Sequence, residues 1–369
     1  MPSSFSRISL FSSLGLLGLP ALLMIAAACS SSASPTGGGY GKAGQAISAA
    51  PASPATSLAT TYPAPAAGGR AYIGLFKDNA VAVLDTASNQ VIRTIAVPTG
   101  PHGIVATADG RKLYVSSDGD SKVSVIDTAT DTVTNAIEVG SNPHNIDLTP
   151  DGRELVVTVF GASQVAFIDT ATDQVTSELP VPQPHNLAIS PDGKTAYVAA
   201  QQPGQTALAE FDLTTNTQIA NVPLDLTPRA LNFSPDGMEL FFTLAGSDSV
   251  QVLNPATNTI GDQISVGPSP HLPLFTADGE YALVVVQGPG DLAVINPDDN
   301  AVVGDITVGS MPHWIAATPD SKTAYVTNEG SNDVSIVDVE SEKVTATVPV
   351  GDGPRKIVLL PAASVQQYP

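Results

Sequence analysis

The segment PHWIAATPDSKTAYVTNEGSNDVSIVD, residues 312–338, carries three marks that recur along the chain. It opens on a Pro-His pair, passes an acidic turn at Asp320-Ser321, and closes an apolar run on Asp338. The first mark, Pro followed by His or Arg, recurs at intervals of 41 to 44 residues, which indicates a repeat architecture. Its seven copies are Pro101-His102, Pro143-His144, Pro184-His185, Pro228-Arg229, Pro270-His271, Pro312-His313 and Pro354-Arg355.

The other two marks keep the same spacing. An acidic turn follows each of the first six Pro pairs, at Asp109-Gly110, Asp151-Gly152, Asp192-Gly193, Asp236-Gly237, Asp278-Gly279 and Asp320-Ser321. An Asp or Asn closes an apolar run in every unit, at Asp85, Asp127, Asp169, Asp212, Asn254, Asn296 and Asp338. Because separate marks agree in period, coincidence is not a reasonable explanation.

Each unit is expected to form four short strands. In the unit that opens at Pro101, these strands are predicted over 103–107, 113–116, 122–127 and 131–138. Asp-Gly between apolar runs is a hairpin signal because these residues adopt positive φ at low cost. Helical periodicity is absent, and four strands in about 42 residues are typical of a propeller blade.

The number of units predicts the size of the ring. Six units are complete between Pro101 and Gly353, whereas the seventh is divided between the two ends of the folded region. Residues 70–98 supply three strands of it, and residues 354–360 supply the missing first strand. The sequence therefore predicts an all-β, seven-bladed propeller in which Arg355–Leu360 pairs beside Ala71–Leu75, which removes the two exposed edges that an open stack of blades would leave.

The motif Tyr325-Val326-Thr327-Asn328 resembles the YVTN β-propeller repeat, and the segments that begin at Tyr114 and Tyr197 are looser copies. This resemblance covers residues 70–361 and implies a YncE-like propeller, followed by a tail over 362–369. Its relatives include YncE-like periplasmic proteins, surface-layer proteins and proteins similar to lactonases or to the haem-d₁ domain of nitrite reductases. Such diversity means that the resemblance implies a fold and no single activity.

The front of the chain is expected to direct export. Arg7 and the apolar residues 10–28 are typical of a signal peptide over 1–28, and the only cysteine, Cys29, follows three alanines as in a bacterial lipoprotein. Ordinary secretion with cleavage after Ala28 and a retained membrane helix are the alternatives. Residues 29–69 are rich in Ser, Ala, Gly and Pro and are expected to form a lipidated tether. The predicted location is the bacterial cell envelope, on the periplasmic face of the outer membrane or on the cell surface.

Charge and missing motifs exclude several functions. The chain has 35 acidic and 15 basic side chains, and its first 69 residues hold no acid and only two bases. The remainder therefore carries 13 − 35 = −22, which argues against nucleic acid as a partner. One cysteine excludes an intrachain disulfide framework and a CxxCH haem attachment. The sequence contains no G-x-S-x-G elbow, no H-E-x-x-H and no Walker loop.

All five histidines occupy one repeat position, and arginine takes the other two. The candidate ligand-binding ring is therefore His102, His144, His185, Arg229, His271, His313 and Arg355. In a propeller these side chains begin the innermost strands, where they would form a basic, partly protonatable collar for an anionic ligand at the channel mouth. The alternative is structural, because a repeated polar residue can fix the joint between blades.

The sequence does not predict a site for a metal ion or a tetrapyrrole. Ligand atoms must come within about 2.1 Å of a zinc-like ion, and two arginines in the ring oppose a cation. No cofactor and no catalytic residue are assigned. The loops between second and third strands, expected at the same end as the histidines, are further candidates. We expect a monomeric, non-enzymatic scaffold for an envelope protein or a small anionic ligand; a lactonase-like hydrolase or a cofactor carrier is the alternative.

Overall fold

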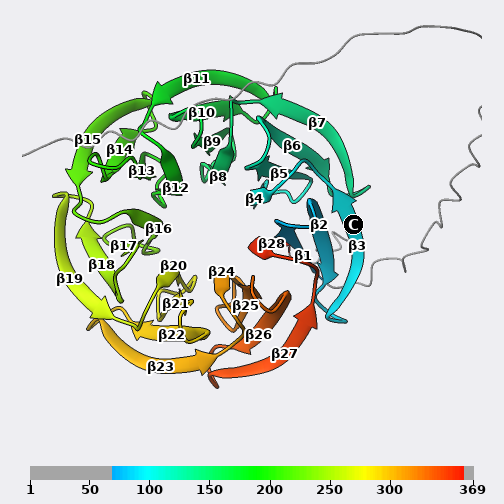
Figure 1. The fold of residues 1–369 in the computed structure, drawn as a ribbon, viewed down its shortest axis with the longest axis vertical. Coiled ribbons are helices and arrows are strands. Elements are labelled where there is room, and N and C mark those ends of the chain that lie inside the picture. The colour runs from blue at the N-terminus through cyan, green and yellow to red at the C-terminus, as the bar shows by residue number, and fades with distance from the viewer. Residues whose placement is uncertain (1–68, 361–369) are drawn as a thin grey trace, which may run out of the picture. The chain divides into compact units, whose positions relative to one another are not determined.

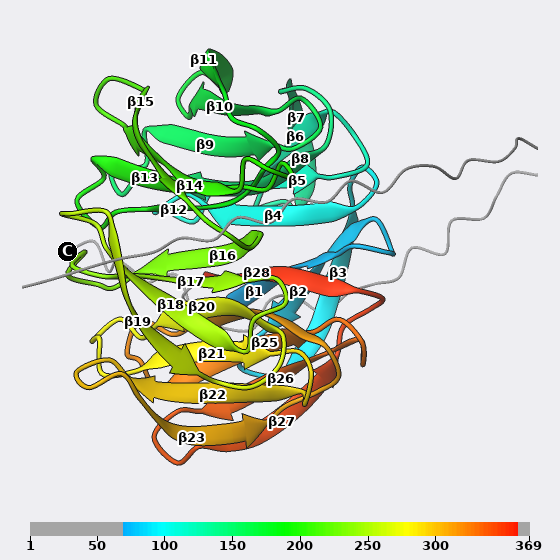
Figure 2. The same cartoon turned by 60° about the vertical axis from the view of Figure 1, so that its left-hand side comes forward.

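The computed structural model describes residues 69–360, which form seven four-stranded antiparallel sheets around a central axis. The predicted seven-bladed propeller is confirmed, and the inner strands run along the ring axis while the outermost strands follow the rim (Figures 1 and 2). The predicted signal peptide, Cys29, the tether and the tail over 362–369 lie outside the described residues. Within 69–360 no helix is long and apolar enough to cross a bilayer.

The strands are named here from the axis outward in each blade. Blade 1 contains β28 (Pro354–Leu360), β1 (Arg70–Leu75), β2 (Ala80–Asp85) and β3 (Gln90–Ala96). Blade 2 contains β4 (Pro101–Ala106), β5 (Lys112–Ser117), β6 (Lys122–Asp127) and β7 (Thr132–Glu138). Blade 3 contains β8 (Pro143–Leu148), β9 (Glu154–Val159), β10 (Gln164–Asp169) and β11 (Gln174–Pro180).

The remaining blades repeat this order. Blade 4 contains β12 (Pro184–Ile189), β13 (Thr195–Ala200), β14 (Ala207–Asp212) and β15 (Thr217–Pro223). Blade 5 contains β16 (Pro228–Phe233), β17 (Leu240–Leu244), β18 (Ser249–Asn254) and β19 (Thr259–Ser265). Blade 6 contains β20 (Pro270–Phe275), β21 (Ala282–Val286), β22 (Asp291–Asn296) and β23 (Ala301–Thr307). Blade 7 contains β24 (Pro312–Ala317), β25 (Thr323–Asn328), β26 (Asp333–Asp338) and β27 (Lys343–Pro349).

Burial along the strands follows their place in the blade. The second and third strands are buried on both faces and read as apolar runs, as in β2 and β21. The outer strands alternate between exposed and half-buried residues, as in β11. The core therefore lies between neighbouring blades, and Tyr72, Tyr114 and Tyr197 are its largest fully buried side chains.

The Asp-Gly turns form hairpins as the sequence predicts. Gly110 has φ +67° and its N–H donates to the Thr107 carbonyl over 2.8 Å. Asp109 accepts a bond of 2.6 Å from the Thr107 hydroxyl and one of 3.1 Å from the Arg111 N–H. Because the turn bonds its own backbone, it sets the register of β4 against β5.

Two kinds of side-chain bond join neighbouring blades. Tyr114 donates its hydroxyl to Asp173 in the next blade over 2.8 Å, and Tyr197 reaches Asn258 in the same way. Nearer the axis, the Ser116 hydroxyl donates over 2.6 Å to the carbonyl of His144 in the next blade. The tyrosine and the Ser or Thr of the repeat motif thus serve the contact between blades.

The ring closes with strands from both ends of the described region. β28 pairs antiparallel with β1, with Arg70 opposite Leu360 and Tyr72 opposite Val358. The predicted pairing of Arg355–Leu360 beside Ala71–Leu75 is confirmed, and β1 has a strand on each side. Blade 1 therefore has four strands like the other blades, and β1 is not left as its open inner edge.

Candidate functional site

The structure brings the seven candidate ring residues to one end of the channel. Each follows the proline that begins an innermost strand: β4, β8, β12, β16, β20, β24 or β28. His102, His144, His271 and His313 are only 4 to 7% exposed, and His185 is half-buried. The shared strand position therefore places all seven residues in one layer, which we call the His/Arg ring.

The five imidazoles form two closely packed groups of tilted rings rather than an even circle. His102 and His144 have ring centres 3.7 Å apart, and His144 and His185 are 3.9 Å apart. On the other side, His271 and His313 lie 4.3 Å apart. Arg229 and Arg355 occupy the two positions between these groups, so the ring alternates grouped imidazoles with single guanidinium groups.

Hydrogen bonds fix the tautomers of two imidazoles. His144 Nδ1 lies 2.9 Å from the carbonyl oxygen of His185, and His185 Nδ1 lies 3.0 Å from that of Arg229. A carbonyl oxygen can only accept, so both Nδ1 atoms must carry the hydrogen. In the neutral form of each ring Nε2 is then an acceptor, and no donor within residues 69–360 bonds it.

The imidazoles are held neutral. Burial lowers the pKa of His185 to about 4, and it lowers the pKa of the other four well below the ordinary value of 6.5. Arg355 also lowers the pKa of all five, and neighbouring histidines lower the pKa of the four other than His185. The sequence predicts a partly protonatable collar, whereas in the structure the imidazoles are neutral and the positive charge of the ring comes from the two arginines.

Arg355 is already compensated by protein groups. Its Nη2 lies 3.1 Å from Glu329 Oε1, and its guanidinium carbon lies 3.7 Å from the centre of the Phe76 ring. Glu329 also lies 3.9 Å from His313 Nε2. This guanidinium therefore has both an ion pair and an aromatic face, which makes it the less available of the two arginines.

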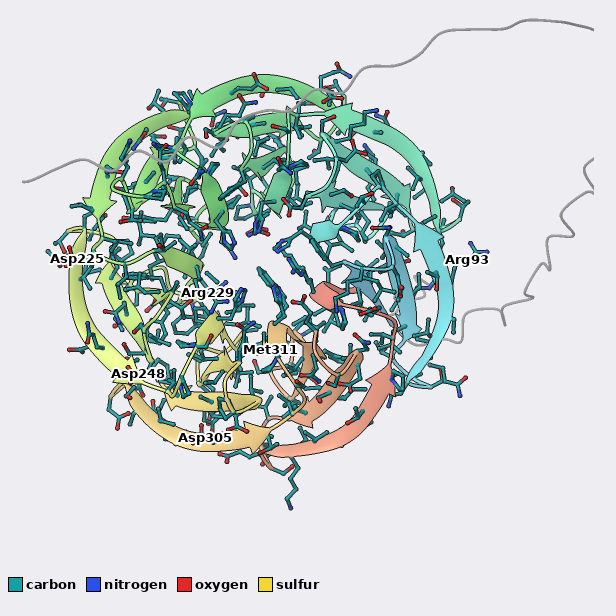
Figure 3. The ribbon with its side chains drawn as sticks, viewed as in Figure 1. Arg93, Asp225, Arg229, Asp248, Asp305 and Met311 are labelled. Atoms are coloured by element: carbon teal, nitrogen blue, oxygen red, sulfur yellow. The ribbon has the colours of Figure 1, made fainter. Side chains whose placement is uncertain are left out.

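Arg229 has polar neighbours and no carboxylate. It donates to the Ser269 hydroxyl over 3.1 Å and to Gln287 Oε1 over 2.9 Å. Among residues 69–360 no acidic group lies within ion-pair distance of it, and its side chain is half-buried. Burial lowers the pKa of Arg229 accordingly. In Figure 3 Arg229 lies near the centre of the ring, whereas Arg93 and Asp305 lie on the rim.

A second set of residues surrounds the His/Arg ring, and we call them the mouth residues. Each follows the second strand of its blade and donates its backbone N–H to the residue before the blade's proline, as Asp118 does to Gly100. They are Phe76, Asp118, Phe160, Gln201, Ala245, Gln287 and Glu329. The loops between second and third strands that the sequence offers as candidates begin at these residues, but the sequence does not single out Phe76, Phe160 or Gln287 individually, although the 41–44-residue spacing contains all seven.

Deeper in the channel, Lys356 bridges two blades that are not neighbours. Its Nζ donates to Asn145 Oδ1 over 3.0 Å and to the Ile146 carbonyl over 2.7 Å, and it lies 5.0 Å from the Trp314 ring centre. Burial lowers the pKa of Lys356 to about 8, although Asp147 opposes this. Trp314 is itself buried. This layer forms a floor beneath the His/Arg ring.

The ring does not fit a metal ion. Its closest imidazole pairs are tilted by 36 to 40° with ring centres 3.7 to 4.3 Å apart, and the two guanidinium groups between them oppose a cation. Within the described part of the chain no group of three or more His, Cys, Asp or Glu side chains could hold an ion.

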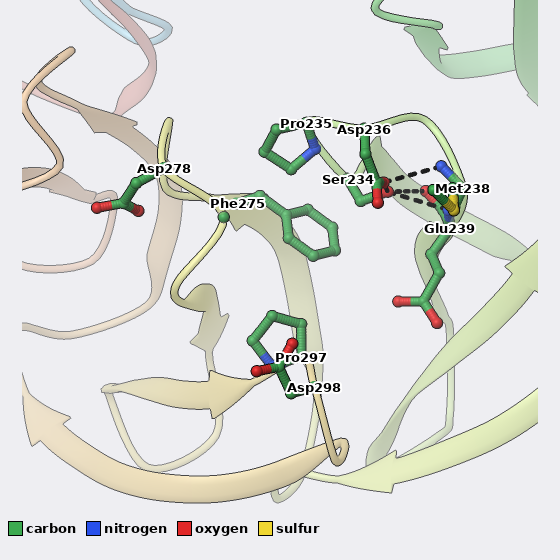
Figure 4. A pocket seen from close by; sticks show the side chains of 10 residues that line it. Ser234, Pro235, Asp236, Met238, Glu239, Phe275, Asp278, Pro297 and Asp298 are labelled. Atoms are coloured by element: carbon green, nitrogen blue, oxygen red, sulfur yellow. Dashed lines mark hydrogen bonds between the residues drawn. The ribbon is translucent and has the colours of Figure 1, made fainter.

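A hollow of about 380 Å³ opens at the opposite end of the blades, between blades 5 and 6 (Figure 4). Asp236, Glu239, Asp278 and Asp298 line it. The Asp236 carboxylate already accepts from the Ser234 hydroxyl over 2.6 Å and from the Met238 N–H over 2.9 Å. The hollow is thus an acidic surface around a turn that recurs in the repeat, and we assign no function to it.

These features define a class: a seven-bladed β-propeller whose channel opens on a polar ring of His and Arg. The model of the family described as "YNCE-like beta-propeller" matches residues 105–357, and this chain belongs to the YncE-like β-propeller family. The predicted resemblance is thereby confirmed for the propeller. No curated protein matches the chain.

Solved structures are similar in fold. Hydrazine synthase of Kuenenia stuttgartiensis has a TM-score of 0.68 at 20% identity, over 73% of this chain and 92% of that one. The periplasmic gluconolactonase PpgL of Pseudomonas aeruginosa has 0.66 at 19%, over 80% and 99%. Apo AztD of Citrobacter koseri has 0.61 at 14%, over 79% and 98%. At these identities the likeness shows the fold alone.

Proposed function

We propose that this chain is a monomeric, lipid-anchored propeller of the bacterial cell envelope that binds a small anionic ligand at its channel mouth and is not an enzyme. The observation that carries this proposal is Arg229, a half-buried guanidinium without an acidic partner among residues 69–360. The folded region carries a net charge of −22, so acidic side chains are abundant, yet none lies within ion-pair distance of Arg229 in residues 69–360.

The free-energy cost of burying the Arg229 guanidinium supports an anion as its missing partner. Partial burial of a guanidinium costs free energy that an ion pair would offset. Gln287 and Ser269 orient the group through neutral oxygen atoms, which leaves its charge unopposed. An incoming carboxylate would gain a charge-assisted bond in a site screened from bulk water.

Calorimetric titration with sodium butyrate at low ionic strength tests the proposal. Arg229→Gln is expected to weaken butyrate binding about tenfold or more, the usual loss for a charge-assisted pair. Arg153→Gln makes the same charge change on the highly exposed Arg153 side chain and serves as the matched control. Equal affinities for all three proteins, or no binding by the parent, would refute the anion site.

Anchoring in the envelope rests on the sequence around Cys29. Replacement Cys29→Ser is expected to abolish incorporation of labelled palmitate and to move the protein from the membrane fraction to the soluble fraction, because the acyl chains supply the membrane affinity. Ser30→Ala, one residue away, should behave as the parent does. A Cys29→Ser protein that is still labelled would exclude lipidation at this residue.

The second candidate is a lactonase-like hydrolase. The neutral imidazoles of His144 and His185 each offer a free Nε2 lone pair, which is one requirement of a general base. Turnover in a panel of lactones that His144→Asn removes would favour this candidate. A metal or tetrapyrrole carrier has less support, because residues 69–360 hold no group of three or more His, Cys, Asp or Glu side chains that could bind an ion.

A further inference from the structure

Asp118 is a second charged group at the mouth without a protein partner. Its carboxylate accepts no hydrogen bond and lies in no ion pair with residues 69–360, and its side chain is half-buried. Burial raises its pKa, and Arg355 reduces that effect from a distance. A partly desolvated carboxylate of this kind favours an approaching cation.

Asp118 and Arg229 belong to opposite sides of the ring. Asp118 is the mouth residue of blade 2, and Arg229 begins the innermost strand of blade 5. In a ring of seven, three steps are the largest separation between two blades. The mouth therefore has one negative group and one positive group without an ion-pair partner among residues 69–360, on blades three steps apart.

Groups beside Asp118 suit an ammonium. His144, in the blade next to that of Asp118, presents an Nε2 lone pair, since its Nδ1 hydrogen is used by the His185 carbonyl. Phe160 is the mouth residue of blade 3, and its ring centre lies 6.5 Å from that of His144. Lone pairs and an aromatic ring both stabilise a protonated amine, whereas they do nothing for a carboxylate.

Groups beside Arg229 suit the opposite charge. The mouth residues of blades 4 and 6 are Gln201 and Gln287. Gln287 accepts from Arg229, and Gln201 donates to the Pro228 carbonyl over 2.7 Å. No carboxylate lies among the mouth residues of blades 4, 5 and 6, so this half of the mouth carries a net positive charge.

We propose that the mouth binds a zwitterion, with a carboxylate at Arg229 and a protonated primary amine at Asp118, the amine also donating to the Nε2 lone pair of His144. This inference rests on the proposed anion site and adds the second charge. The ligand class is an amino acid whose amine and carboxylate are separated by a chain that spans the channel.

Calorimetry with a series of ω-amino acids, from glycine to 8-aminooctanoate, tests the inference at pH 7.5. Each is compared with the matched carboxylate and the matched amine, such as 4-aminobutyrate with butyrate and butylamine. One length is expected to bind about tenfold or more tightly than its carboxylate, because a second charge-assisted bond forms. Asp118→Asn should remove that advantage and leave carboxylate binding within about twofold of the parent.

The outcomes separate the two proposals. If carboxylates bind and no amino acid binds more tightly than its carboxylate, the zwitterion inference is wrong and the anion site stands. If neither class binds, both are wrong. If an amino acid still binds more tightly than its carboxylate in Asp118→Asn but not in Glu329→Gln, the amine lies at blade 7 and the assignment to Asp118 is wrong. Melting temperatures of both variants show whether the fold is retained.

Discussion

Deletion of residues 354–369 is expected to abolish the folded monomer. The deletion removes β28, which forms the innermost strand of blade 1 and pairs with β1 along its whole length. It also removes the buried Ile357 side chain and the bonds from Lys356 to blade 3. Without β28 the edge of β1 is open toward the channel and can pair with other chains. A typical domain is stabilised by only about 5 to 15 kcal/mol, so loss of a whole strand with its packing and bonds is expected to unfold the chain.

Size-exclusion chromatography and circular dichroism detect this outcome as aggregate or unfolded chain. A shorter deletion of residues 362–369 is the matched control, since it leaves β28 whole and should keep the melting temperature of the parent. If the longer deletion yields a monomer of parental stability, closure of blade 1 by β28 is not needed for the fold, and the proposed origin of ring stability must be given up.

Acidification from pH 7 to pH 5.5 is expected to destabilise the protein on the order of 5 kcal/mol. The five buried imidazoles stay neutral in the folded state, because their pKa values are lowered, to about 4 in His185. In the unfolded chain they take up protons near pH 6.5. The folded state keeps its full stability above pH 6.5 and loses stability as the pH falls from 6.5 toward the folded pKa values. By pH 5.5 the loss is about 1 kcal/mol for each imidazole ring.

Other titrating groups act outside this window or oppose the effect. Lowered carboxyl pKa values, such as that of Asp109, matter below about pH 4. Lys356, whose pKa falls to about 8, changes stability only between that value and its ordinary 10.5. Asp118 and Asp147 have raised pKa values, so their protonation in the folded state favours folding as pH falls and reduces the slope.

Urea unfolding at half-unit pH steps measures this loss, and calorimetry in buffers of different ionisation enthalpy counts the protons taken up on unfolding. The parent should take up several protons near pH 5.5. His271→Asn combined with His313→Asn should take up about two fewer, whatever its absolute stability. A flat stability profile between pH 7 and pH 5.5 would show that the imidazoles are protonated in the folded state.

The repeat spacing predicts the fold because a blade needs the same turn and core residues each time. The Pro-His pairs and the Asp-Gly turns give the number of blades, the four strands and the closing strand, and all are observed. They also predict that seven nitrogen-bearing side chains share one end of the channel. These conclusions depend on position along the strand, which sequence records directly.

The electrostatics of the ring depend on distances that spacing does not record. Packed sheets lie about 10 Å apart. At that spacing, the rings of neighbouring histidines come into contact only if every side chain turns toward the axis. Blades converge toward the axis, and His102 and His144 have ring centres 3.7 Å apart, which removes water and holds them neutral. The isolation of Arg229 likewise depends on which loops approach it, so only the structure could single out this arginine.

Long-range proton–nitrogen NMR of the imidazoles during a butyrate titration is the most direct test of a ligand site at the His/Arg ring. At pH 7 the free protein should show His144 and His185 with protonated Nδ1 and unprotonated Nε2. Butyrate should shift the His185 ring signals, since His185 bonds the Arg229 carbonyl, and Arg229→Gln should suppress the shift. Ring signals that stay unmoved at saturating butyrate would contradict a ligand site at this ring.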